Sequence, residues 1–176
     1  IEDSSYEELK TLRLQGTSEH IPLFSDVLDY VNGRVPLLIE LKLPSKDTRL
    51  CNYTLKLLRT YKGPVLIQSF NSLGVRWFFK NAPDILRGQL SSSLTKTNPE
   101  SPYLARFFVQ HLLTNIFCHP DFISYKMTDT SNLGVWLNQH LYRIPIAVWT
   151  LRNPKTYNQA QQKYDMYIFE GFSKKI

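Results

Sequence analysis

The strongest constraint on the fold of this chain is a short apolar segment bracketed by two prolines, VPLLIELKLP at residues 35–44. The apolar stretch runs from 37 to 43, which is too short for a helix between prolines and predicts one buried parallel strand. Two charged residues, Glu40 and Lys42, interrupt it. Because residues two apart in a strand lie on one face, this carboxylate and this ammonium are expected to project together near the strand's carboxyl end.

Two interpretations of Glu40 and Lys42 follow from the residues alone, and both stay open at this point. The first is an internal salt bridge inside a barrel. The second is a functional site, because barrels of alternating strands and helices carry their chemistry at the carboxyl ends of the strands. In that case the Glu40 carboxylate suits Mg²⁺ or Ca²⁺, and the Lys42 ammonium suits a phosphate.

The rest of the chain alternates between strand and helix patterns. Further strands are predicted at 65–70, 85–90, 122–127, 146–151 and 166–169, a short capped turn at 5–12, and helices at 22–32, 48–63, 71–80, 103–114, 132–142 and 153–164. This alternation predicts an α/β fold with parallel strands, either a doubly wound sheet or most of a (β/α)₈ barrel. No Gly-x-Gly-x-x-Gly or Walker-type loop follows a strand, which disfavours a nucleotide-binding sheet. The polar residues 91–102 are expected to form a loop over the mouth of the fold.

Composition limits the class of protein. A chain of 176 residues with 43% hydrophobic content predicts one domain over residues 1–176. Its net charge of +6 favours anionic partners, but the basic residues are scattered, so no nucleic-acid binding is predicted. No apolar run is long enough to span a membrane. Cys51 and Cys118 lack metal-ligand spacing and are expected to be buried free thiols, which indicates a reducing, cytoplasmic location.

Four motifs in order resemble the glycerophosphodiester phosphodiesterase family of the PLC-like phosphodiesterase superfamily. They are Ile21-Pro22-Leu23-Phe24 before a helix, Ile39-Glu40-Leu41-Lys42, Ser69-Phe70, and Trp149-Thr150. The resemblance spans most of the chain. It implies a TIM-type barrel that hydrolyses glycerophosphodiesters to sn-glycerol 3-phosphate and an alcohol with Ca²⁺ or Mg²⁺ as cofactor.

The resemblance also implies roles for four residues. Glu40 would be one of the carboxylates that bind the divalent cation, and Lys42 would be catalytic by stabilising charge on the phosphate. Phe70 and Trp149 would bind the substrate as apolar walls at the mouth. The alternative for Trp149 and Phe70 is that they are core aromatics of the barrel.

The sequence lacks the family motifs that would precede the predicted strand at 37–43. The family's His-Arg-Gly, Glu-x-Asp and His-Asp motifs are absent, and none of the four histidines lies in a matching motif: His20, His111, His119 and His140. The chain is therefore expected to be an N-terminally truncated barrel with the last six strands, lacking the acid and base histidines and inactive as it stands. Its two unpaired edge strands are expected to favour self-association.

Two other hypotheses remain. The first is a non-catalytic barrel that binds phosphodiester head groups or a protein partner through the same mouth. The second is an unrelated α/β-barrel hydrolase in which Glu40 and Lys42 only pair with each other. The released alcohol, the native metal and the oligomeric state do not follow from the sequence.

Overall fold

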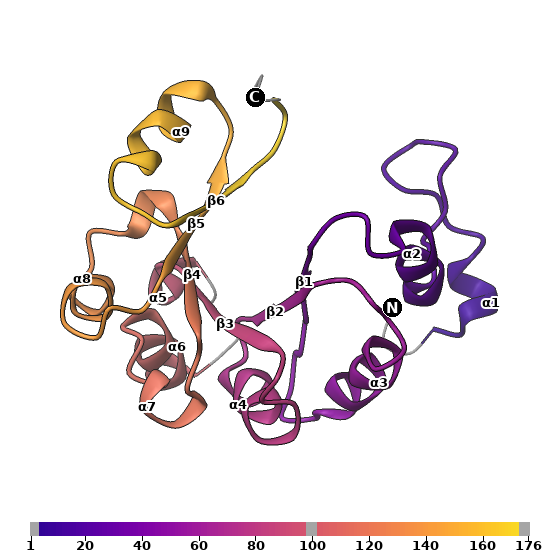
Figure 1. Ribbon diagram of the computed structural model, residues 1–176, viewed down its shortest axis with the longest axis horizontal. Coiled ribbons are helices and arrows are strands. Elements are labelled where there is room, and N and C mark those ends of the chain that lie inside the picture. The colour runs from indigo at the N-terminus through magenta and orange to yellow at the C-terminus, as the bar shows by residue number, and fades with distance from the viewer. Residues whose placement is uncertain (1–3, 98–101, 173–176) are drawn as a thin grey trace.

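A computed structural model describes residues 4–97 and 102–172 of the chain. Six parallel strands form one sheet in sequential order. They are β1 (Leu37–Glu40), β2 (Val65–Ser69), β3 (Leu86–Ser91), β4 (Phe122–Lys126), β5 (Ile146–Leu151) and β6 (Met166–Phe169). The sheet curls into a half-barrel, as Figure 1 shows. The prediction of a partial TIM-type α/β barrel is therefore confirmed, and the doubly wound alternative is wrong.

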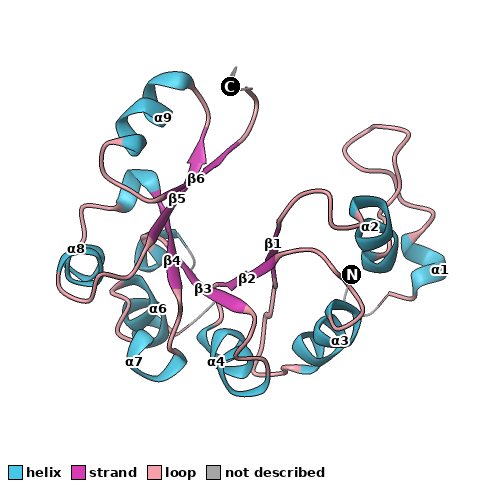
Figure 2. Cartoon of the chain, in the orientation of Figure 1, coloured by secondary structure: helices cyan, strands magenta, loops and turns pink. Residues whose placement is uncertain are grey.

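The main helices cover the convex side of the curled sheet (Figure 2). The helices are α1 (Tyr6–Leu9), α2 (Phe24–Val31), α3 (Arg49–Leu58), α4 (Ser72–Asn81), α5 (Leu94–Thr97), α6 (Tyr103–Gln110), α7 (Asn115–Cys118), α8 (Leu133–His140) and α9 (Pro154–Gln161), with a 3₁₀ turn η1 (Met127–Asp129) after β4. Each connection between consecutive strands thus places a helix outside the sheet, which leaves the concave side to the residues at the mouth.

Several helix predictions differ from the structure at their ends; the helices predicted at 48–63 and 153–164, for example, end at Leu58 and Gln161. The helix expected at 103–114 ends at Gln110, because Leu112 adopts a left-handed backbone with φ of 58° and is buried in the core. Burial of this side chain overrides the helical periodicity, and α7 begins only after Thr114. The helix expected to start at Pro22 begins at Phe24 instead, with Leu23 in extended backbone as its N-cap. The expected mouth loop contains α5, and its residues 98–101 lie outside the described residues.

The hydrophobic core lies between the sheet and the helices and divides into two clusters. One surrounds Ile67 and Phe78, which pack β1 and β2 against α3 and α4. The other surrounds Ile123, Tyr125 and Val148 under α8 and α9. These strand residues therefore face outward, and the residues that alternate with them face the concave side.

Cys51 and Cys118 are free and completely buried, as the sequence predicted. Burial raises the pKa of the Cys51 thiol to about 11 and that of Cys118 to about 12. Since the thiolate is the reactive form, neither thiol should react with a thiol reagent at pH 8 while the protein is folded. Both should react once denaturant is added. Rapid labelling of the native protein, followed by mass spectrometry, would contradict this placement.

β1 and β6 are the two edges of the sheet. Leu38 of β1 is 41% exposed, so the edge strand is less buried than the sequence predicted. An exposed apolar edge favours pairing with another chain, and self-association stays a prediction. No helix within residues 4–97 and 102–172 is long and apolar enough to cross a membrane.

Candidate functional site

Glu40 and Lys42 lie together at the carboxyl end of β1. Glu40 is the last residue of the strand, and the Lys42 ammonium lies 2.9 Å from its Oε1. The two side chains therefore project together, as the sequence predicted. Lys42 itself lies beyond the strand, although the Leu41 N–H still donates to the Gln68 carbonyl oxygen at 2.8 Å and keeps the chain beside β2.

The ion pair between Glu40 and Lys42 is open to solvent. The Lys42 side chain is 83% exposed and the Glu40 side chain 33% exposed. Exposed ion pairs contribute about 0–1 kcal/mol to folding, because water screens the charges and two long side chains lose freedom. The pair therefore does little for stability, and the ammonium can turn to an anion at small energetic cost.

A cavity of about 110 Å³ opens beside Glu40. Its lining comes from the carboxyl-end parts of several strands and consists of Glu40, Gln68, Phe70, Leu90, Trp149, Thr150 and Ile168. The Phe70 and Trp149 rings meet edge to face, with 5.9 Å between their centroids. The structure therefore brings three predicted site residues, Glu40, Phe70 and Trp149, to one place, although they are far apart in the sequence.

Strand register explains why these residues converge. Glu40 pairs with Gln68 across β1 and β2, while Ile67 faces the outer core. Strand alternation then directs the Glu40 and Gln68 side chains to the concave side. In β5, near the opposite edge of the sheet, Val148 is in the outer core, so the next residue, Trp149, faces the concave side. The β5–β6 register shifts between Val148 and Leu151, next to this tryptophan.

Asn71 ties the loop after β1 to the start of α4. Its Oδ1 accepts a hydrogen bond from the Leu73 N–H at 3.0 Å and caps the helix. Its Nδ2 donates to the carbonyl oxygens of Leu43 and Ser45 at 3.0 and 2.7 Å. One side chain thus fixes the chain just beyond Lys42 to the helix that follows Phe70.

Replacing Asn71 by alanine should therefore lower the free energy of unfolding by about 2 kcal/mol, because it removes a helix cap and leaves two carbonyl groups without their donor. The matched control is Asn153→Ala, which removes the cap of α9 through Thr156 and should cost about 1 kcal/mol. Urea unfolding of both variants measures the difference. Equal losses would show that the contacts to the β1 loop contribute nothing.

The described residues do not complete a divalent-cation site. Glu40 is the one carboxylate in the lining of the cavity, and no group of three or more histidine, cysteine or acidic residues gathers anywhere in the described part of the chain. Mg²⁺ and Ca²⁺ require about six or more oxygen ligands. Glu40 and the Gln68 amide oxygen are too few, so Ca²⁺ or Mg²⁺ binding stays a prediction.

The histidines lie elsewhere. The His140 ring stacks on Trp136 and the His119 ring lies against Phe79. His111 packs on Phe107, and the lining of the cavity includes no histidine. The described residues at the cavity thus offer charge and apolar walls but no imidazole for proton transfer.

Thr150, which lines this cavity, was predicted only as part of the Trp149-Thr150 motif, and no role was predicted for Gln68, Leu90 or Ile168. For Gln68 a signal was present, because it stands two residues before Phe70 and so shares its face of the strand. A larger cavity of about 430 Å³ lies at α8 and the chain after α9, lined by Trp136 and Lys163 among others. It includes none of the predicted site residues.

Comparison with known proteins shows similarity at the level of structure. No protein-family model matches the sequence, and no curated protein matches it. A glycerophosphodiester phosphodiesterase from Parabacteroides distasonis superposes with a TM-score of 0.71 at 17% identity, over 96% of this chain and 68% of that one. The enzyme of the same name from Thermotoga maritima gives 0.67 at 20% identity, over 96% and 67%.

A third similar structure contains a ligand. The phosphodiesterase from Oleispira antarctica, solved in complex with its product sn-glycerol 3-phosphate, gives a TM-score of 0.65 at 13% identity. The match covers 85% of this chain and 57% of that one. The chain therefore spans between about half and two thirds of the length of these structures and shares the fold of glycerophosphodiester phosphodiesterases, as the sequence resemblance predicted.

Proposed function

We propose that this protein hydrolyses glycerophosphodiesters to sn-glycerol 3-phosphate and an alcohol, and that the cavity beside Glu40 holds the glycerol phosphate part of the substrate. One observation carries the proposal. A carboxylate paired with a lysine, and two aromatic rings, meet at the carboxyl ends of strands. The fold is that of a phosphodiesterase solved with sn-glycerol 3-phosphate bound.

The residues of the cavity have distinct tasks in this proposal. Lys42 turns from Glu40 to a phosphate oxygen and neutralises charge on it, as an ammonium point charge does. Phe70 and Trp149 pack against the carbon atoms of the glycerol and exclude water from that side. Glu40 would be one ligand of a divalent cation, which needs more oxygen ligands than this cavity offers, and the cation would supply further charge neutralisation at the phosphate.

Hydrolysis also requires proton transfer. A water oxygen bonds to phosphorus, the bond from phosphorus to the alcohol oxygen breaks, and one proton of the water ends on the departing alcohol. Histidines most often move such protons, and none lines this cavity. In this proposal the residues of the cavity bind the substrate, and the groups that move the protons are not among the residues that line it.

The proposal is tested by measuring choline release from sn-glycero-3-phosphocholine by the full-length natural protein, with Ca²⁺, with Mg²⁺ and with a chelator. Metal-dependent release that Lys42→Met lowers about tenfold or more supports it, since that variant removes a charge from the phosphate site. Release that is unchanged in the variant, or that persists in the chelator, contradicts these assignments.

A second function is a non-catalytic barrel that binds phosphodiester head groups. It is favoured by one observation, that the cavity lining contains a single carboxylate and no histidine. In that case the full-length protein binds sn-glycero-3-phosphocholine in a Lys42-dependent manner and releases no choline under any metal condition. The same assay, read together with a binding titration, separates the two functions.

A further inference from the structure

Two buried polar atoms at the cavity have no partner. Gln68 is 7% exposed, and its Oε1 is buried without a hydrogen bond in the described part of the chain. The indole Nε1 of Trp149 is also buried and unpaired there. Both side chains line the cavity that Glu40 borders. Buried polar groups in folded proteins nearly always have a partner, so two orphans in one cavity indicate a missing one.

A second buried glutamine, Gln89, has protein partners for its side-chain amide and serves as a comparison for Gln68. Gln89 lies one strand away on β3 and is completely buried on the outer side of the sheet. Its Oε1 accepts from the Ser72 hydroxyl at 2.8 Å, and its Nε2 donates to the carbonyl oxygens of Phe70 and Leu90 at 3.1 and 2.8 Å. Gln68 has none of these contacts, although it is nearly as buried.

We infer that Gln68 and Trp149 together bind a hydroxyl group of the ligand, with Gln68 Oε1 as the acceptor and Trp149 Nε1 as the donor. This inference rests on the proposed function and assigns Gln68 as a specificity-determining residue for the glycerol part of the substrate. A hydroxyl fits because it both donates and accepts a hydrogen bond.

Other ligand groups fit the pair less well. An oxygen of a phosphodiester accepts from Trp149 but carries no hydrogen to give to Gln68 Oε1. A primary ammonium donates to Gln68 but accepts nothing from the indole, and a quaternary ammonium such as choline does neither. The cavity of about 110 Å³ has room for several water molecules and hence for a small polyol fragment.

The consequence is a preference for hydroxylated ligands. A site built to bond a hydroxyl rejects the analogue that lacks it, because its own polar groups then stay unpaired. sn-Glycerol 3-phosphate should therefore bind at least about tenfold more tightly than 1-propyl phosphate, which has the same carbon length and no free hydroxyl. Inorganic phosphate and glycerol are the two further probes, since each presents one half of the ligand.

The experiment follows the Trp149 indole N–H resonance in ¹H–¹⁵N spectra of the full chain, which has three tryptophans. Trp149→Phe assigns the resonance. Titration with sn-glycerol 3-phosphate should shift it strongly and 1-propyl phosphate weakly. Gln68→Met, which keeps the length of the side chain and removes the amide, should abolish the preference between the two phosphates.

Stability gives an independent readout. Because the Gln68 Oε1 is buried without a protein partner among the described residues, Gln68→Met should raise the unfolding midpoint by about 2–4 °C. The matched control Gln89→Met removes a fully bonded amide and should lower the midpoint. A Gln68→Met variant that unfolds at a lower temperature than the natural protein would show a structural role and overturn the inference.

The binding results distinguish a failure of the hydroxyl site from a failure of the proposed function. Equal affinity for both phosphates in the natural protein, or a preference that survives Gln68→Met, overturns the hydroxyl site and leaves the phosphate site in place. A Gln68-dependent shift with glycerol but none with any phosphate supports the hydroxyl site and contradicts the proposed function. No shift with any of the four probes contradicts both.

Discussion

Glu40→Gln is expected to change the affinity for sn-glycerol 3-phosphate in opposite directions with and without Ca²⁺. Without a divalent cation, the Glu40 carboxylate repels a phosphate near Lys42, so the neutral variant should bind more tightly than the natural protein, by up to about tenfold. With Ca²⁺ in excess, the natural protein should bind about tenfold more tightly than the variant, because only the carboxylate attracts the cation.

Isothermal titration in chelator and in Ca²⁺ measures this change of sign. Lys42→Met is the companion variant and should weaken binding under both conditions, since the ammonium meets the phosphate directly. The matched control is Glu7→Gln in the exposed Glu7–Lys10 pair on α1, which lies outside the cavity. An equal effect of Glu40→Gln under both conditions would contradict a cation at this carboxylate.

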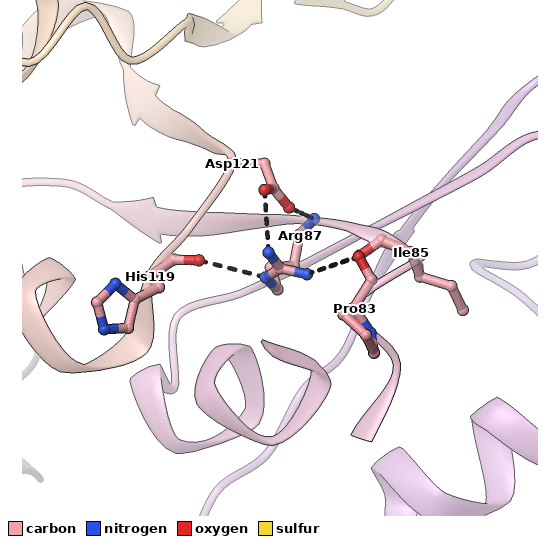
Figure 3. Close-up of polar contacts among 5 residues, drawn as sticks. All are labelled: Pro83, Ile85, Arg87, His119 and Asp121. Atoms are coloured by element: carbon pink, nitrogen blue, oxygen red, sulfur yellow. Dashed lines mark hydrogen bonds and ion pairs between the residues drawn. The ribbon is translucent and has the colours of Figure 1, made fainter. Parts of the chain in front are cut away.

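Asp121→Ala is expected to lower the free energy of unfolding by about 3–5 kcal/mol, because it leaves the buried Arg87 guanidinium without its carboxylate partner. The Arg87 side chain is only 7% exposed, and its Nη2 donates to Asp121 Oδ1 at 3.0 Å. Figure 3 shows the remaining donors of Arg87 directed at backbone carbonyls, including those of His119 at 3.2 Å and Ile85 at 3.2 Å. The cluster joins the amino-terminal ends of β3 and β4, opposite the cavity.

Two variants test this explanation by urea unfolding. Asp84→Ala breaks the exposed pair with Arg59 and should cost much less stability than Asp121→Ala, because both side chains are well solvated. Arg87→Met combined with Asp121→Ala should cost less than Asp121→Ala alone, since no buried charge remains. A double variant less stable than the single one would show that Arg87 contributes mainly through packing and its carbonyl contacts.

The architecture could be predicted from the sequence because strand patterns survive in each segment. The apolar runs at 146–151 and 166–169 became β5 and β6 with the predicted bounds. The predicted strand at 37–43 ends three residues early, at Glu40, which pairs with Gln68 of β2. Long-range burial decided the break at Leu112, which no local pattern signals.

The site could be predicted only in part. Alternation placed Glu40 and Lys42 on one side, and the ordered motifs selected Phe70 and Trp149. The contact between the two rings depends on sheet curvature and on the register shift in β5, neither of which a sequence pattern encodes. The unpaired state of Gln68 is likewise a property of the packed interior. The roles of these residues, the Ca²⁺ or Mg²⁺ requirement and a cytoplasmic location stay predictions.

The most direct test of the central claim is a crystal structure of the protein with sn-glycerol 3-phosphate. The account predicts the glycerol carbons against Phe70 and Trp149, and a phosphate oxygen within hydrogen-bonding distance of the Lys42 ammonium. Lys42 still bonded to Glu40, with the ligand bound away from this cavity, would contradict it.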